Sequence, residues 1–364
     1  MAVKYRPFLP FRSPWNPRVS FEPNPTVKQT LSILTFLAIA VASLGDAIEF
    51  TWPTPNDAWA MGKGPEAYIL SREPGNPDSG KFGCTLNSGM VFHDGIDLKP
   101  LQWDWMDEPT DPVRSVMPGV VRYINRDRNK SEWGQYVVIE HHLLDPKLVS
   151  VYSHLRSIPI ELKVGETVKE GQTIGILGRT RPGNFNLPKA QAHLHFEVAL
   201  KLSDSFPLWY GRQETSGPNK NGVWNPRNLV AIDFLDLVEN LKAGETDTIQ
   251  HYFFMEPIAV SLKVQSLKKP DFIRRYPELI GESSNQSEVH GWQINFNAYG
   301  LPSAWRALTK NEVVTMGPNP TEVVYHDPNE LSRFPCNELI EANWQGAVVA
   351  GPRLLEIVSI IFDL

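Results

Sequence analysis

The sequence predicts a mainly β protein, with a compact antiparallel sheet or barrel-sandwich domain followed by a C-terminal α+β region. The chain of 364 residues contains 31 prolines and 25 glycines, which favour turns because proline is excluded from helix interiors. It also contains 11 tryptophans, 17 phenylalanines and 10 tyrosines, and aromatic side chains suit pleated surfaces. Short apolar runs recur between turn residues from Met90 to about Leu241, with few long helical patterns between them.

Length and charge limit the classes of function. At roughly 100 to 200 residues per domain, the chain has room for about two globular units. Its 41% hydrophobic residues and mean hydropathy of -0.27 indicate a folded protein. The formal net charge is -6, without the basic excess that binding to a phosphate backbone requires, so nucleic acid is not an expected partner. Composition does not decide the oligomeric state.

Residues 1–47 have the pattern of an export segment. An uncharged apolar run, Leu31–Leu44, follows a leader that is rich in basic residues. The run is shorter than the roughly 20 residues of a membrane-spanning helix, and its length suits the apolar part of a signal peptide. We therefore expect export to the periplasm or cell envelope. An uncleaved membrane anchor and a buried core helix are the alternatives, and the anchor would be the one contact with a membrane.

The rest of the chain divides into three regions. Residues 48–88 form a lead-in rich in proline, glycine and asparagine, which predicts extended chain with turns. Residues 89–241 form the compact β domain, with a helix expected over Leu229–Leu241. Its expected strands are Gly119–Tyr123, Gln135–Glu140, Leu148–Tyr152, Thr173–Leu177 and Leu194–Leu200.

Residues 242–364 are expected to be an accessory domain of unknown function. Strand-like runs cover Ile258–Val264 and Val289–Asn297, and a last helix is expected over Arg353–Phe362. The two cysteines, Cys84 and Cys336, allow one disulfide, and two buried thiols are an equal alternative.

The histidines carry the chemistry. His93 and Asp97 are four residues apart around Gly95, and an extended segment would place both on one face. His193 and His195 share one strand face, while Leu194, Phe196 and Val198 form the opposite, core-facing side. His154 follows another apolar strand. Imidazole and carboxylate groups suit Zn²⁺, and three such ligands leave a coordination position open for catalysis.

A single histidine at a strand end is usually an ordinary polar residue, so the prediction depends on the combination. The remaining histidines are expected to be structural or surface residues: His141, His142, His251, His290 and His326.

In this order, the motifs resemble those of the lysostaphin and LytM-like zinc metalloendopeptidases, which cut peptidoglycan peptides. The resemblance covers residues from about Gly89 to Val198. Its motifs are His93 with Asp97, Pro118–Val121, Tyr136–His141, Tyr152–Leu155, Gly165–Gly178 and His193–Glu197. The resemblance implies that His93, Asp97 and His195 hold Zn²⁺. It also implies that His154 and His193 orient the attacking water and stabilise the developing oxyanion, with stem peptides or cross-bridges of peptidoglycan as substrate.

Two loops depart from the family pattern. Residues 99–112 are acidic and rich in tryptophan, and residues 179–191 replace a short glycine turn. Both are expected to border the cleft, with Trp103 and Trp105 contributing to recognition.

The alternative function is a non-catalytic wall-binding regulator or activator of other wall hydrolases, the role of relatives that have lost their metal ligands. All five expected site residues are present here, which favours the enzyme. A phosphocarrier with paired histidines would work in the cytoplasm, and the expected export argues against it.

Overall fold

The computed structural model describes residue 48 and residues 50–364, apart from 214–216, 282–287 and 317–319. The expected export segment, residues 1–47, lies outside the described residues. The described residues belong to one compact unit. Among them, no helix is both long and apolar enough to cross a membrane.

Strands occur along the whole described chain, whereas its α-helices begin at Phe206, and the longest of them, Phe234–Ala243 and Pro352–Phe362, have 10 and 11 residues. The strands are β1 (Gly83–Leu86), β2 (Val91–His93), β3 (Ile96–Leu98), β4 (Pro112–Arg114), β5 (Gly119–Asn125), β6 (Tyr136–His141), β7 (Leu148–Ser153), β8 (Thr167–Val168), β9 (Thr173–Ile176), β10 (Leu194–Lys201), β11 (Leu229–Ile232), β12 (Val260–Gln265), β13 (Gly291–Phe296), β14 (Pro302–Leu308), β15 (Thr321–His326), β16 (Ile340–Ala342) and β17 (Val348–Ala350). The α-helices are α1 (Phe206–Gly211), α2 (Phe234–Ala243), α3 (Ile249–Met255), α4 (Asp271–Arg275), α5 (Lys310–Val314), α6 (Pro328–Leu331) and α7 (Pro352–Phe362).

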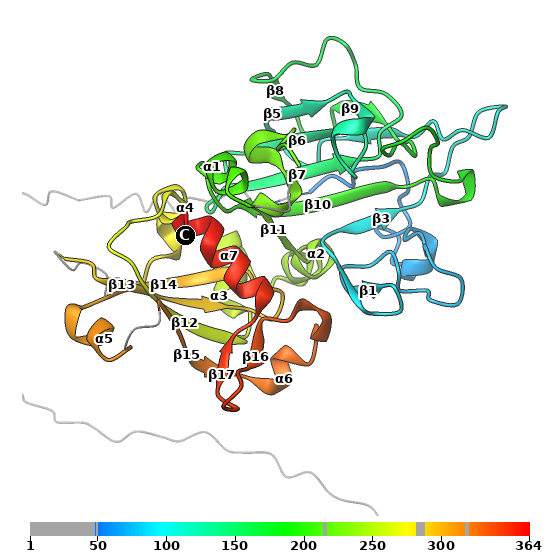
Figure 1. Ribbon diagram of the computed structural model, residues 1–364. Helices are drawn as coiled ribbons and strands as arrows, with labels where there is room; N and C mark the ends of the chain where they lie inside the picture. Colours follow the sequence, from blue (N-terminus) through cyan, green and yellow to red (C-terminus); the bar gives the residue numbers. More distant parts are fainter. Residues whose placement is uncertain (1–47, 49, 214–216, 282–287, 317–319) are drawn as a thin grey trace, which may run out of the picture. The chain divides into compact units, whose positions relative to one another are not determined.

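The main sheet confirms the predicted antiparallel β architecture. Its strand order is β11-β10-β7-β6-β5-β8, and β3 pairs with the free edge of β10 beside β11 (Figure 1). All of these pairs are antiparallel. β10 is therefore an interior strand with partners on both sides, and every one of its residues is buried.

The sequence of β10 explains its position. Leu194, Phe196 and Val198 lie in the main hydrophobic core, as the alternation predicts. His195 and Glu197 alternate with them and therefore lie on the opposite face. One strand thus anchors the core and carries the polar site.

The helix expected over Leu229–Leu241 is wrong at its beginning. Residues 229–232 form β11, because these four apolar side chains are all buried where the strand pairs with β10. The helix α2 begins only after Asp233, whose side chain accepts hydrogen bonds from the backbone N–H groups of Leu235 and Asp236. Tertiary pairing decides this segment against its helical periodicity.

The C-terminal region is α+β, as predicted. Its antiparallel sheet has the order β14-β13-β12-β15, and α7 packs against it (Figure 1). Trp305 of β14 contacts Phe362 of α7, with ring centroids 6.0 Å apart. Apolar residues of α7 such as Ile357 and Ile361 are buried in this core.

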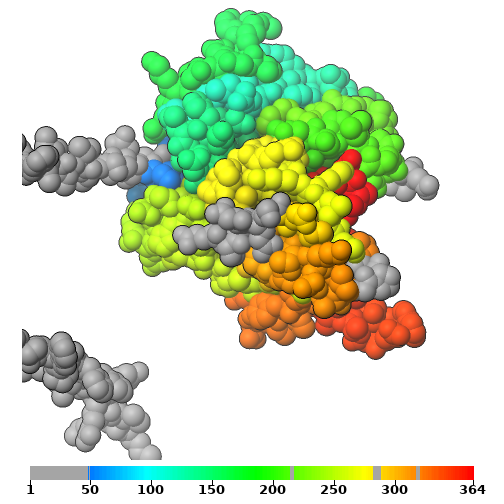
Figure 2. Space-filling view, turned by 90° about the vertical axis from the view of Figure 1, so that its left-hand side faces the viewer, coloured from blue at the N-terminus to red at the C-terminus, as the bar shows by residue number. Residues whose placement is uncertain are grey.

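The main hydrophobic core continues without a break from the first sheet into this C-terminal region. At the end of β10, the backbone N–H of Lys201 donates to the Tyr276 hydroxyl at 3.0 Å, and Arg275 donates to the Lys201 carbonyl at 3.0 Å. In Figure 2, the yellow segment that carries α4 lies directly against the green and teal part of the chain. The C-terminal region therefore packs on the strand that carries His195.

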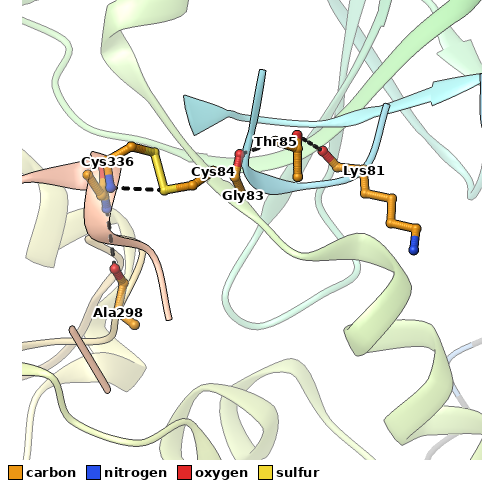
Figure 3. Close-up of a disulfide and its surroundings, with 7 residues drawn as sticks. Lys81, Gly83, Cys84, Thr85, Ala298 and Cys336 are labelled. Atoms are coloured by element: carbon orange, nitrogen blue, oxygen red, sulfur yellow. Dashed lines mark hydrogen bonds between the residues drawn. A yellow bond between two sulfur atoms is a disulfide. The ribbon is translucent and has the colours of Figure 1, made fainter. Parts of the chain in front are cut away.

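A disulfide joins the two regions a second time. Cys84 of β1 is bonded to Cys336, which lies in a short 3-10 helix, Pro335–Asn337 (Figure 3). β1 pairs with β2 so that Gly83 lies opposite His93. Phe334, two residues before Cys336, packs on Phe82 and Phe92, with its ring centroid 6.1 and 5.6 Å from theirs. The β1–β2 hairpin, residues 83–93, is thus attached to the C-terminal region.

Candidate metal centre

His93 and Asp97 meet across a bend between two strands. β2 ends at His93 and β3 begins at Ile96, so the expected single extended segment is wrong. A Cβ atom on Gly95 would lie 2.5 Å from the Phe196 carbonyl oxygen of β10. Glycine is therefore needed here because the chain at Gly95 approaches β10 closely, and the same Cβ atom would lie 3.0 Å from Cε1 of the His195 ring.

β10 brings His195 directly opposite Asp97 in the strand pairing. The His93 Nε2, Asp97 Oδ1 and His195 Nδ1 atoms converge. His93 Nε2 lies 3.0 Å from His195 Nδ1 and 3.3 Å from Asp97 Oδ1, and His195 Nδ1 lies 2.9 Å from the same oxygen. Ligands about 2.0–2.1 Å from a tetrahedral zinc ion lie roughly 3.3 Å from one another. The spacing and the donor set both fit Zn²⁺, and the three residues are buried.

Hydrogen bonds fix which nitrogen of each ligand faces the centre. His93 Nδ1 lies 2.8 Å from the Lys81 carbonyl oxygen and donates to it, which leaves Nε2 free to accept a metal. His195 Nε2 donates to Glu197 Oε1 at 2.7 Å, which leaves His195 Nδ1 free to accept a metal. Sequence reasoning gave Glu197 no role of its own, although its position two residues after His195 on one strand predicts a shared face.

The other two expected site residues border the three ligands. His193 Nε2 lies 3.4 Å from Asp97 Oδ1 but makes no hydrogen bond within the described part of the chain. The His154 ring centroid lies 4.8 Å from that of His193. His193 Nδ1 donates to the Gln191 carbonyl oxygen at 2.7 Å. His154 Nδ1 donates to the Thr180 carbonyl oxygen at 2.8 Å. Each Nε2 is therefore left as an acceptor in the neutral ring.

His154 has an unusual backbone conformation. Its φ of 60° lies in the left-handed region, which is uncommon outside glycine. This residue follows the last residue of β7, and its backbone N–H donates to the Trp133 carbonyl at 2.8 Å. The turn directs the ring toward His193 instead of continuing the strand, and such strain is typical of functional sites.

The site's electrostatics favour a cation among the ligands. Burial opposes ionisation of Asp97, but His193 and His93 outweigh it and hold the pKa of Asp97 well below its usual value. Burial lowers the pKa of His195, but hydrogen bonds to Asp97 and Glu197 outweigh it and raise that pKa to about 10. A proton or a metal ion is therefore stabilised between the two carboxylates.

The two flanking imidazoles have the opposite preference. Burial and the neighbouring imidazoles hold the pKa of His154 well below its ordinary value. Burial lowers the pKa of His193 to about 4, against the attraction of Asp97. Both rings are therefore neutral near pH 7 and able to accept a proton.

Two residues near the centre were missed by sequence reasoning. Arg72, from the lead-in region, places its guanidinium Nη1 3.5 Å from Asp97 Oδ2. The half-buried indole of Trp133 lies 6.4 Å from the His195 ring, centroid to centroid. Neither residue belongs to a motif, so only tertiary structure could reveal them.

Ion pairs hold the loops of residues 99–112 and 179–191, which differ from the family pattern, close to His154. Arg156 donates to Asp104 Oδ2 at 3.0 Å, and Arg179 forms an ion pair with Glu108. Arg156 is two residues from His154, and Arg179 precedes Thr180, which accepts the His154 hydrogen bond. Trp105 is 90% exposed and Trp103 is 43% exposed, so both rings are available for contact.

The remaining histidines lie outside the cluster. His141 is buried, and its nitrogens contact the Pro118 carbonyl at 3.0 Å and the Ser150 hydroxyl at 2.8 Å. Burial lowers its pKa to about 4. The structural role expected of His141 thus agrees with its contacts. Across the described residues, the one group of three or more His, Cys, Asp or Glu side chains able to hold a metal ion is His93, Asp97 and His195.

Comparison with protein families identifies this part of the chain. Residues 91–207 match the model of peptidase family M23, and the matched segment contains all five expected site residues. The family expected from the motifs is therefore confirmed for this segment. No curated protein matches the chain.

Several solved structures are similar to it. A zinc-containing peptidase from Vibrio cholerae is 24% identical over 42% of this chain and 33% of that chain, with a TM-score of 0.23. The catalytic domain of a prophage-encoded M23 protein from Enterococcus faecalis is 23% identical over 36% and 79% of the two chains, with a TM-score of 0.25. The catalytic domain of the antimicrobial peptidase lysostaphin from Staphylococcus simulans is 20% identical over 44% and 87%, with a TM-score of 0.26. The chain thus spans about a third of the Vibrio protein.

Proposed function

We propose that this chain, whose residues 91–207 match peptidase family M23, is a zinc-dependent endopeptidase that hydrolyses amide bonds in peptidoglycan stem peptides or cross-bridges. The observation that carries the proposal is the convergence of His93 Nε2, Asp97 Oδ1 and His195 Nδ1 within 3.3 Å of one another. Three protein ligands with an open fourth position are the arrangement of catalytic zinc sites. The peptidoglycan substrate is what the resemblance of the motifs to the lysostaphin and LytM-like family implies.

The residues around the centre have separate tasks. When bound, Zn²⁺ polarises the substrate carbonyl and lowers the pKa of water to about 7. Glu197 holds the His195 ring so that Nδ1 faces the ion. His154 and His193 present acceptor nitrogens, which can take a proton from water and return it to the leaving amine. Their backbone hydrogen bonds keep both rings in the required tautomer.

We place the enzyme in the periplasm or cell envelope, with residues 1–47 as its signal peptide or anchor. The Cys84–Cys336 disulfide supports an oxidising compartment, where such bonds persist. In this proposal, residues 48–88 are the lead-in, residues 89–241 form the peptidase domain and residues 242–364 form an accessory domain.

The test compares wild type with His193→Ala on isolated cell walls of defined cross-link chemistry. Wild type should release new peptide amino termini without new reducing sugar. The variant should retain zinc, since His193 is not among the three converging ligands, and lose roughly 10²- to 10⁴-fold in rate with its proton acceptor. Zinc content by mass spectrometry and end-group labelling measure the two effects. His142→Ala, an exposed histidine, is the matched control and should behave as wild type.

A regulator that only binds cell walls would give a different result. Both proteins would then bind walls equally, and neither would cut a range of cross-linked substrates with zinc in place. That outcome would replace the enzyme with the wall-binding regulator.

A further inference from the structure

Arg72 belongs to a loop whose two ends are fixed to a metal ligand's own backbone. The Leu70 N–H donates to the Asp97 carbonyl at 2.7 Å, and the Asp97 N–H donates to the Gly80 carbonyl at 2.8 Å. Residues 70–80 therefore form a loop along the outer edge of β3, opposite β10. The family match begins at residue 91, so this loop lies outside it.

The loop's backbone holds Arg72 in place. The N–H groups of Arg72 and Glu73 both donate to the buried hydroxyl of Ser79, at 2.8 and 2.9 Å. The Arg72 carbonyl accepts a hydrogen bond from the Gln191 side chain at 3.4 Å, close to the beginning of β10. These contacts fix the backbone beside His193 and Asp97, so the side chain starts from a defined position.

The guanidinium has unused hydrogen-bonding capacity. An arginine side chain carries five N–H donors. Within the described residues, the Arg72 guanidinium donates no hydrogen bond, and its one ion pair is the 3.5 Å approach to Asp97 Oδ2. That side chain is 31% exposed, while Asp97 is fully buried. Donors next to the ligand carboxylate therefore face an accessible space.

Charge favours an anion in that space. A divalent ion and Asp97 together carry one positive charge, and Arg72 adds a second at the same side. Glu197 lies behind His195 and is bonded to its Nε2, the ring nitrogen that faces away from Asp97. A guanidinium matches the planar geometry of a carboxylate and can bind it through two parallel hydrogen bonds.

We propose that Arg72 is a substrate-binding residue that recognises a free carboxylate on the peptide, within about one residue of the scissile amide. This inference rests on the proposed function and adds a substrate class to it. The spacing follows because an extended residue spans roughly 3.3–3.6 Å, so a group bound beside Asp97 is a near neighbour of the amide at the metal. A peptide with a carboxamide at this position would lose the charge-assisted pair.

The experiment measures binding to the zinc-loaded full chain, separately from turnover. The probes are acetyl-glycyl-glycine and acetyl-glycyl-glycinamide, which differ only in the terminal charge, checked as intact after titration. Wild type should bind the carboxylate roughly tenfold to a hundredfold more tightly than the carboxamide. Arg72→Gln should reduce that ratio to within about threefold of unity, and Arg72→Lys should keep part of it because the charge remains.

Lys99→Gln is the matched control. Lys99 follows β3 on the same side of the sheet and carries the same charge, but its Nζ donates to the Glu66 carbonyl and not toward Asp97. The control should keep the wild-type ratio. Zinc content of every variant is measured before titration, so that a carboxylate bound only by the ion is recognised as a ratio that Arg72→Gln leaves intact.

Three outcomes would overturn the assignment. The first is an equal or unmeasurable affinity for both peptides in wild type. The second is an unchanged ratio in Arg72→Gln. The third is loss of zinc from Arg72→Gln with a wild-type ratio in the zinc-loaded fraction, which would make Arg72 a support for Asp97 only. Failure of the proposed function is distinguishable, because a protein that releases no amino termini from walls can still show the carboxylate preference.

Discussion

The M23-matching segment and the C-terminal region, residues 242–364, both bury polar groups, but only the first gathers them into a cluster of metal-binding side chains among the described residues. In the first, His93, Asp97, His193 and His195 are buried in mutual contact, and some of their atoms have no hydrogen-bond partner among the described residues. In the second, Glu278, Tyr299 and Glu322 also have a buried side-chain oxygen without a hydrogen-bond partner, but its described residues include no group of three His, Cys, Asp or Glu side chains able to hold a metal ion.

The difference indicates which region has the side chains to hold a ligand. Burying ionisable groups together costs free energy unless a partner compensates for it. A cation bound by His93, Asp97 and His195 would supply that compensation in the first region, whereas aromatic packing around Trp305 stabilises the second. The C-terminal region contacts the end of β10 and the β1–β2 hairpin, and therefore supports two of the segments that carry metal ligands.

The largest expected effect is the loss of zinc from a variant of the M23-matching segment. His195→Ala removes a ligand from the centre and two carboxylate contacts, so bound zinc should fall from about one ion per chain to less than about 0.1. The substitution should leave the far-ultraviolet circular dichroism unchanged. Metal analysis after dialysis measures the loss, and near-stoichiometric zinc in this variant would remove His195 from the ligand set.

The matching substitution in the other region is Trp305→Ala. Trp305 is only 2% exposed and packs against Phe272 and Phe362, so its loss should cost about 3–5 kcal/mol of unfolding free energy. The folded fraction should keep its zinc. If the zinc is lost while the variant remains folded, the division between the two regions fails.

A further prediction concerns the disulfide between the two regions. Cys84→Ser with Cys336→Ser opens a loop of 252 residues, and loss of such a native bond should lower the unfolding free energy by about 2–5 kcal/mol. Urea titration of the variant and of wild type, each with and without reductant, measures it. Reductant should destabilise wild type and leave the double variant unchanged. Equal stability of the oxidised wild type and the variant would mean that packing of Phe334 alone holds the hairpin.

The smallest effect is a pH dependence at the boundary between the regions. Burial, followed by repulsion from Asp236 of α2, raises the pKa of Glu256 to about 7. The pKa of Glu256 in the folded protein thus exceeds its value of about 4.5 in the unfolded chain. The stability that protonated Glu256 contributes is therefore complete below about pH 4.5 and is lost as the pH rises through about 7. Glu256→Gln should therefore gain roughly 1–3 kcal/mol over wild type between pH 5 and pH 8.

Denaturation at several pH values measures this gain. Glu330→Gln is the control, because it removes another carboxylate of the same region, one that forms an ion pair with Arg333 at 2.8 Å. Parallel pH profiles for wild type and Glu256→Gln would show that Glu256 keeps an ordinary pKa in the folded protein.

Sequence periodicity predicted the parts of the site that depend on strand alternation. The shared face of His193 and His195 and the opposite core face of Phe196 follow from the period of two along β10. The antiparallel sheet also followed from the strand patterns, whereas the division of the five site residues into three ligands and two flanking histidines came from the family resemblance. The bend at Gly95 was not predicted, because it results from the close approach to the Phe196 carbonyl on another strand.

Other features depend on contacts that no local pattern contains. Arg72 reaches Asp97 through the hydrogen bonds of residues 70–80, and neither the spacing nor the composition of that loop indicates a site. Residues 229–232 have the apolar spacing of a helix, yet pairing with β10 makes them a strand. The partner of Cys84 was one of two equal alternatives until the fold placed Cys336 beside it.

The alternation along β10 also determines which genetic changes the site can tolerate. Deleting or inserting one residue between Leu194 and Lys201 would exchange the two faces of the strand beyond that point. A deletion at Leu194 would direct imidazole and carboxylate groups into the hydrophobic core and Phe196 toward the metal. A point substitution such as His195→Ala would remove one candidate ligand and leave the core face of β10 in place, whereas a change of one residue in strand length would disrupt the candidate metal site and the core together.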